Sequence, residues 1–91
     1  TLFFEIERIL KEKQPIGFIL ENVEGLVSHN NGKTFQRILS ILEQLGYFVS
    51  WKILNSIDFS IPQNRKRVYI IGNRMKKISF ESIPLYPKKN L

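Results

Sequence analysis

Two stretches of the chain repeat apolar residues at spacings of three and four, the pattern of an amphipathic helix. The first begins at Leu2, and we expect it to end at Gln14-Pro15, because the residue before a proline disfavours the helical conformation. The second begins at Thr34 and ends before Gly46, a residue type that commonly adopts the left-handed conformation after a helix. The pattern therefore predicts two helices, each with one apolar face.

Three other stretches have the composition of β-strands. Residues 16–20 are almost wholly apolar, as expected for a parallel strand that is covered on both faces. Residues 47–54 alternate and are rich in β-branched and aromatic side chains, and residues 67–72 form a further apolar run, RVYIIG. Only about a dozen residues without a helical pattern join the last two strands, so we expect these strands to be antiparallel neighbours.

The predicted order of elements, α-β-α-β-β, fits part of a doubly wound, Rossmann-like α/β sheet that ends in an antiparallel strand pair. We expect residues 28–33, with two Asn and a Gly, to form a polar, flexible loop, and residues 78–83 to form at most a weak strand. A helical pattern is already under way at Thr1, and the last residues contain no obvious closing element. We therefore expect a fragment or one subunit of a larger fold.

Size and charge narrow the possible functions. The 91 residues form at most one small domain, and 14 Lys and Arg against 8 Asp and Glu give a formal charge of +6. The excess lies mainly in residues 65–77 and 88–89, which favours nucleic acid as a partner; the alternative is a soluble domain from a lysine-rich proteome. No apolar stretch approaches the roughly 20 residues of a membrane span and no signal peptide is evident, so we expect a cytoplasmic protein without a membrane partner.

The chain contains no cysteine, which excludes a disulfide, a thiolate metal site and a cysteine nucleophile within it. The one histidine, His29, cannot form a zinc site without partners that the sequence does not show, and we interpret it as a surface residue. Tyr47, Phe48 and Trp51 are candidates for stacking on bases, but their alternation within a strand favours packing instead.

Two charged motifs indicate a binding site. Glu21 follows the first apolar run, where a carboxylate would lie over a ligand crevice; the alternative is that it simply faces water. Arg65 and Arg67 are two residues apart, so in an extended chain their side chains share a face. Paired guanidinium groups suit an anionic or carbonyl-rich ligand such as a nucleotide, and a solvated basic loop is the alternative.

Taken together and in this order, the segments resemble the cytosine-5 DNA methyltransferase family. PIGFILENVEGL is similar to its motif VI, and GYFVSWKILNSIDFSIPQNRKRVYIIG is similar to motif VII followed by the Gln-x-Arg-x-Arg motif VIII. The resemblance covers residues 1–73 and implies the C-terminal half of an S-adenosylmethionine-dependent methyltransferase catalytic domain. Residues 74–91 would then begin a linker or a target-recognition region.

The resemblance also implies roles for individual residues. Glu21 matches the catalytic glutamate that binds N3 and the exocyclic amine of a flipped-out cytosine, and Arg67 matches the arginine that contacts the base O2 and orients the glutamate. Arg65 matches the first arginine of motif VIII, near the nucleophile loop and the backbone of the target nucleotide. On the substrate-binding side, Asn22 would fix the turn after the strand and Gln63 would shape the loop.

The chain also departs from the family pattern, because the Pro-Cys nucleophile motif and the glycine-rich S-adenosylmethionine loop are absent. They would have to precede Thr1 or come from a complementary N-terminal half, so we expect the chain alone to be inactive. DNA is the expected substrate, in a bacterial cytoplasm or nucleoid and in a restriction-modification setting. A transfer-RNA cytosine-5 methyltransferase and a nonenzymatic DNA-binding or regulatory remnant are the alternatives.

Overall fold

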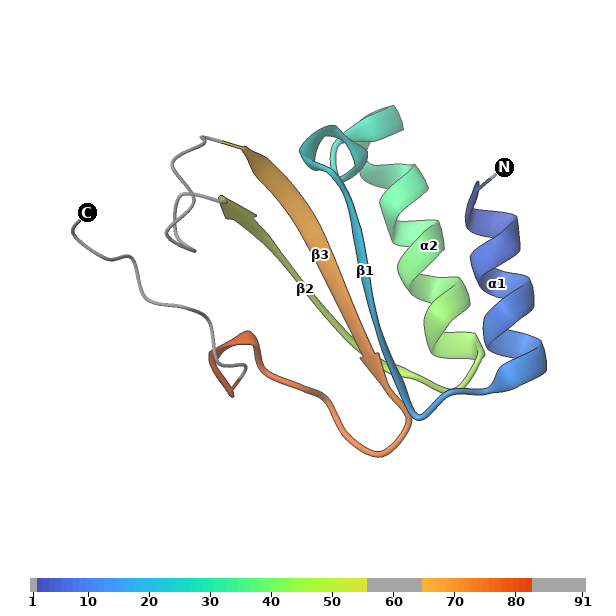
Figure 1. Cartoon of the computed structure of the whole chain (residues 1–91). Helices are drawn as coiled ribbons and strands as arrows, with labels where there is room; N and C mark the ends of the chain where they lie inside the picture. The colour runs from blue at the N-terminus through green and yellow to red at the C-terminus, as the bar shows by residue number, and fades with distance from the viewer. Residues whose placement is uncertain (1, 56–64, 83–91) are drawn as a thin grey trace.

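The computed structural model describes residues 2–55 and 65–82. Its regular elements follow the predicted order: α1 (Leu2–Lys13), β1 (Gly17–Val23), α2 (Lys33–Gln44), β2 (Phe48–Asn55) and β3 (Lys66–Asn73). The three strands form one sheet in the order β1-β3-β2, in which β3 runs antiparallel to both neighbours. The two helices lie side by side against one face of this sheet (Figure 1).

The apolar faces of both helices and the sheet meet in a single core. Its buried members come from α1, α2 and β3 and from the residue before β2: Leu10, Phe35, Leu42, Tyr47, Val68 and Ile70. Close packing near the end of β3 requires a glycine, because a Cβ on Gly72 would lie 2.1 Å from the ring of its cross-strand neighbour Phe18. After α2, Gly46 adopts φ 99°, as the helix-ending pattern predicted.

The antiparallel pairing of β2 with β3 confirms the prediction for the last two strands. The prediction for the first strand was wrong for the described residues, because β1 pairs antiparallel with β3 and only one of its faces is covered by helices. On the other face Ile19 remains 65% exposed and Val23 53% exposed. A short apolar run does not tell one covered face from two, so the double winding also does not appear within these residues.

Two smaller segments also differ from expectation. Residues 28–33 contain the 3₁₀ turn His29–Gly32, in which Asn30 and Asn31 adopt left-handed backbone angles, and a further 3₁₀ turn spans Glu24–Leu26. Asn tolerates that conformation because its short polar side chain can bond locally, so the segment is a defined turn and α2 begins at Lys33. Instead of a weak strand, the structure has a 3₁₀ turn at Phe80–Ser82; residue 83 lies outside the described residues.

The segment after β3 returns over the face of the sheet that the helices leave open (Figure 1). Ser50 Oγ donates a hydrogen bond of 2.7 Å to the carbonyl oxygen of Ile78, and Ile71 on that face is only 5% exposed. This cover therefore lies near the start of β2 and the end of β3, where Ser50 and Ile71 are paired. Within residues 2–55 and 65–82, no helix has the length and apolar character needed to cross a bilayer.

Candidate functional site

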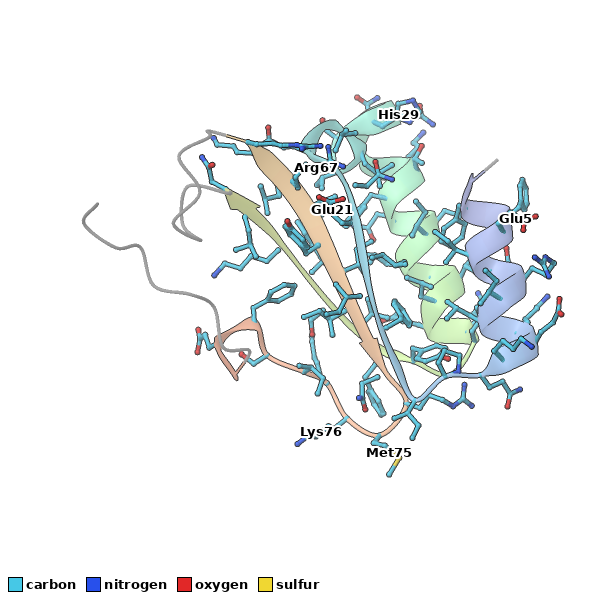
Figure 2. All side chains as sticks on the ribbon, in the orientation of Figure 1. Glu5, Glu21, His29, Arg67, Met75 and Lys76 are labelled. Carbon is cyan, nitrogen blue, oxygen red and sulfur yellow. The ribbon has the colours of Figure 1, made fainter. Side chains whose placement is uncertain are left out.

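Glu21 and Arg67 meet although they are 46 positions apart in the sequence. In the register of the sheet, Glu21 is opposite Tyr69 and Arg67 is opposite Val23. Directly opposed residues share a face of a sheet, and so do residues two apart on one strand. Glu21 and Arg67 are therefore diagonal neighbours on the face away from the helices, and Figure 2 shows them at the same end of the sheet.

The contact between them is bidentate. Arg67 Nε donates to Glu21 Oε2 and Nη2 donates to Oε1, both at 3.1 Å. The side chain of Arg67 is 20% exposed and that of Glu21 is 45% exposed. An ion pair this accessible contributes at most about 1 kcal/mol to stability, so its main consequence is geometric. The planar guanidinium group holds both carboxylate oxygens in one orientation.

Glu21 also borders a cavity of about 280 Å³ between β1 and the helices. Its lining is mostly apolar, with Asn22 and Thr34 adding polar atoms; the other lining residues are Phe3, Ile6, Leu20, Leu26, Ile38 and Ile70. Arg67 does not belong to this lining. The cavity thus reaches the β1 backbone at Glu21 from the helix side, while the carboxylate binds Arg67 on the other face of the sheet.

The structure describes two of the other three predicted site residues, Arg65 and Asn22. Arg65 lies immediately before β3, is exposed, and donates its backbone N–H to Asn55 Oδ1 at 3.1 Å. Asn22 lies within β1 rather than after it, and its Oδ1 accepts the N–H of Val23 at 2.7 Å. Its predicted effect on the following turn stays a prediction. Gln63 lies outside the described residues.

The three aromatic residues at the start of β2 and just before it differ in how far they are packed. Trp51 packs edge-on against Phe35 of α2, with ring centroids 4.8 Å apart, although it remains 42% exposed. Tyr47 is buried, and its hydroxyl donates to the carbonyl oxygen of Pro15 at 2.7 Å. Phe48 is 52% exposed, so packing does not account for all of its surface.

His29 is exposed, as predicted, and its Nδ1 lies 2.8 Å from Thr34 Oγ1. Within the described part of the chain, no three His, Asp or Glu side chains are grouped so as to hold a metal ion.

Sequence reasoning did not select Asn55, Tyr69 or Lys52 for the site. Tyr69 is half-buried and stands opposite Glu21 on one side and Lys52 on the other, so the three form a row across the open face. Only the strand register reveals this row. For Asn55 a weak sequence signal existed, because an Asn at a strand end commonly bonds to nearby backbone.

The sequence matches the family described as C-5 cytosine-specific DNA methylase over residues 1–90. This chain belongs to that family. It is 55% identical to the Type II methyltransferase M.NlaIV of Neisseria lactamica and 54% identical to M.NgoBV of Neisseria gonorrhoeae, in each case over all of this chain and 24% of the relative. The chain therefore spans about a quarter of the length of these curated relatives.

The chain also resembles part of a solved methyltransferase structure. The methyltransferase EhMeth of Entamoeba histolytica superposes with a TM-score of 0.63 and 26% sequence identity, covering 85% of this chain and 22% of that one. The arrangement of helices and strands is thus that of part of a methyltransferase α/β fold.

A methylase of this family implies a methyl donor, for which S-adenosylmethionine is the general choice. The chain does not supply a glycine-rich loop for this donor, because its five glycines are widely spaced along the sequence.

Proposed function

We propose that this chain is the base-binding quarter of a DNA (cytosine-5)-methyltransferase, which transfers a methyl group from S-adenosylmethionine to C5 of a flipped-out cytosine. The observation that carries the proposal is the bidentate contact between Arg67 and Glu21, which joins two motifs 46 residues apart in a member of the C-5 cytosine-specific DNA methylase family. A charge pair formed only for stability would add little on an exposed face.

The roles of the two side chains follow from the electronic demands of the reaction. A nucleophile adds to C6 of the cytosine, and negative charge then develops at N3 and O2 of the ring. The carboxyl group of Glu21, bonded to the N3 edge, would stabilise that charge as it forms. Arg67 would hold the carboxylate in position and offer its remaining N–H donors to O2. A flipped base is needed because C5 and C6 are inaccessible in a stacked duplex.

Basic residues next to this pair fit a polyanionic substrate. Arg65 and Lys66 lie at the same end of the sheet as Arg67, and both are exposed. Exposed lysine and arginine side chains bind phosphates without sequence preference, and this binding weakens as salt rises. We therefore assign them to the backbone of the target strand rather than to the base.

The rest of the enzyme must supply the nucleophile and the donor site. The chain has no cysteine, so the Pro-Cys motif and the glycine-rich loop would belong to a complementary N-terminal part. S-adenosylmethionine would bind there and supply the electrophilic methyl group. The Type II names of the relatives support a bacterial restriction-modification setting for the assembled enzyme.

The test is to assemble the enzyme from this chain and its complementary part and to measure transfer of labelled methyl groups to DNA. Glu21→Gln should reduce turnover roughly 10²–10⁴-fold, since it removes the group that shares a proton with N3. Glu5→Gln is the matched control, because Glu5 also binds an arginine at 2.8 Å but on the outer surface of α1. Equal turnover in the two variants would refute the role of Glu21. Methylation of transfer RNA instead of DNA would show that transfer RNA is the substrate.

A further inference from the structure

We propose that Asn55 is a positioning residue, which fixes the position of Arg65 and thereby the contact of Arg65 with the target nucleotide. This inference rests on the proposed function. Asn55 is the last residue of β2, and Arg65 immediately precedes β3. The side-chain oxygen of Asn55 accepts the backbone N–H of Arg65 at 3.1 Å, across ten positions of sequence. The bond therefore ties the two ends of the connection between the strands.

The two arginines of the motif are held in different ways. Arg67 lies inside the sheet, opposite Val23 on β1 and Leu54 on β2, and its side chain is clamped by Glu21. Arg65 lies one residue beyond the last cross-strand pair, Asn55 with Lys66. The Asn55 side chain supplies a hydrogen bond where the strand pairing has already ended. The side chain of Asn55 thus holds the backbone of Arg65 in place, as the pairing between strands holds the backbone of Arg67.

This bond has a consequence for the side chain of Arg65. In extended backbone, a rotation about one residue changes the direction in which its side chain points. Losing the bond would free the backbone at Arg65 while the sheet still holds Arg67. Misplacement of a substrate-binding group by about 1 Å can cost up to about 10²-fold in rate. Asn55 would therefore influence turnover without touching the base.

A double-mutant cycle in the assembled enzyme tests this inference. Asn55→Ala should lower kcat/KM for DNA about tenfold or more, and the same change made on top of Arg65→Ala should cost little further. Asn55→Asp keeps an acceptor oxygen and should retain most of the activity. Asn73→Ala is the matched control, because Asn73 at the other end of β3 accepts the N–H groups of Met75 and Lys76 with its Oδ1.

Several outcomes would overturn the proposal. If the costs of Asn55→Ala and Arg65→Ala simply add, Asn55 acts through general stability and not through Arg65. Normal turnover in Asn55→Ala or in Arg65→Ala would overturn it as well. If Asn55→Ala fails to fold, Asn55→Asp decides: loss of activity in a folded Asn55→Asp enzyme contradicts the role of the acceptor oxygen.

Hydrogen exchange separates this proposal from the proposed function. The backbone amide of Arg65 should exchange slowly in the unaltered enzyme and in Asn55→Asp, and at least tenfold faster in Asn55→Ala; unchanged exchange in Asn55→Ala overturns the proposal. If Glu21→Gln leaves turnover intact while Arg65 exchange still depends on Asn55, the proposed function fails and the hydrogen bond stands. If Glu21→Gln abolishes turnover but the cycle is additive, the role of Asn55 alone fails.

Discussion

The two faces of the sheet differ in what they contain. The face against the helices carries the fully buried side chains Phe35, Leu42 and Val68 at its interface. The opposite face carries Glu21 and Arg67 in a bidentate contact, beside the exposed side chains of Ile19 and Val23. Buried packing is therefore concentrated on one face, and the site that we propose lies on the other. Substitutions should consequently change the free energy of unfolding or the turnover according to the face on which they lie.

The largest effect is expected on the helix-covered face. Leu42→Ala should lower the free energy of unfolding by about 2–5 kcal/mol, because it leaves a cavity at a fully buried position. Denaturation followed by the fluorescence of Trp51, the single tryptophan, would measure this loss. Lys11→Ala on the outer surface of α1 is the control, with little change expected. A loss below about 1 kcal/mol for Leu42→Ala would mean that the core lies elsewhere.

The next effect belongs to the open face and concerns turnover. Arg67→Lys keeps the positive charge but cannot donate to both oxygens of Glu21, so we expect methyl transfer to fall about 10²-fold. The free energy of unfolding should change by less than about 1 kcal/mol, as for an accessible ion pair. Steady-state kinetics of the assembled enzyme and denaturation of the same preparation give both numbers. If the losses of stability and of turnover were equal when both are expressed as free energies, the two faces would not differ in the way described.

A third substitution probes the close contact between strands. Gly72→Ala would place a Cβ 2.1 Å from the ring of Phe18, so we expect a loss of about 1–3 kcal/mol from overpacking. Because the ring is what the new methyl group meets, combining it with Phe18→Leu should recover part of that loss. Thermal melting of the single and double variants measures this coupling. Strictly additive losses would show that the glycine is needed for its backbone and not for the ring.

The smallest effect is expected for Ile19→Ser on the open face. Its side chain is 65% exposed, so the free energy of unfolding of the chain should change by no more than about 0.5 kcal/mol. Leu20→Ser, its neighbour on the helix side, is the comparison and should cost more, since Leu20 packs against the core. Equal losses at the two positions would contradict the one-sided cover of β1.

The residues of the proposed site show how far sequence reasoning reached. It selected Glu21 and Arg67 from two motifs, and the structure brings them within hydrogen-bonding distance. It did not foresee that β3 lies between β1 and β2, because a strand's partner is chosen by packing across the whole sheet. The bond from Asn55 to Arg65 depends on that arrangement and was missed for the same reason. Gln63 is outside the described residues, so its predicted role stays a prediction.

By itself, the sequence determined the local conformations, such as the end of α1 before Pro15 and the turn at Gly46, together with the family to which the chain belongs. These depend on neighbouring residues or on motifs, which are present in the linear chain. Only the tertiary structure decided which face of β1 is covered and that Glu21 lies diagonal to Arg67. The physical reason is that cross-strand register is set by the burial of one face and by pairing between distant segments. Neither can be deduced from one segment of the sequence alone.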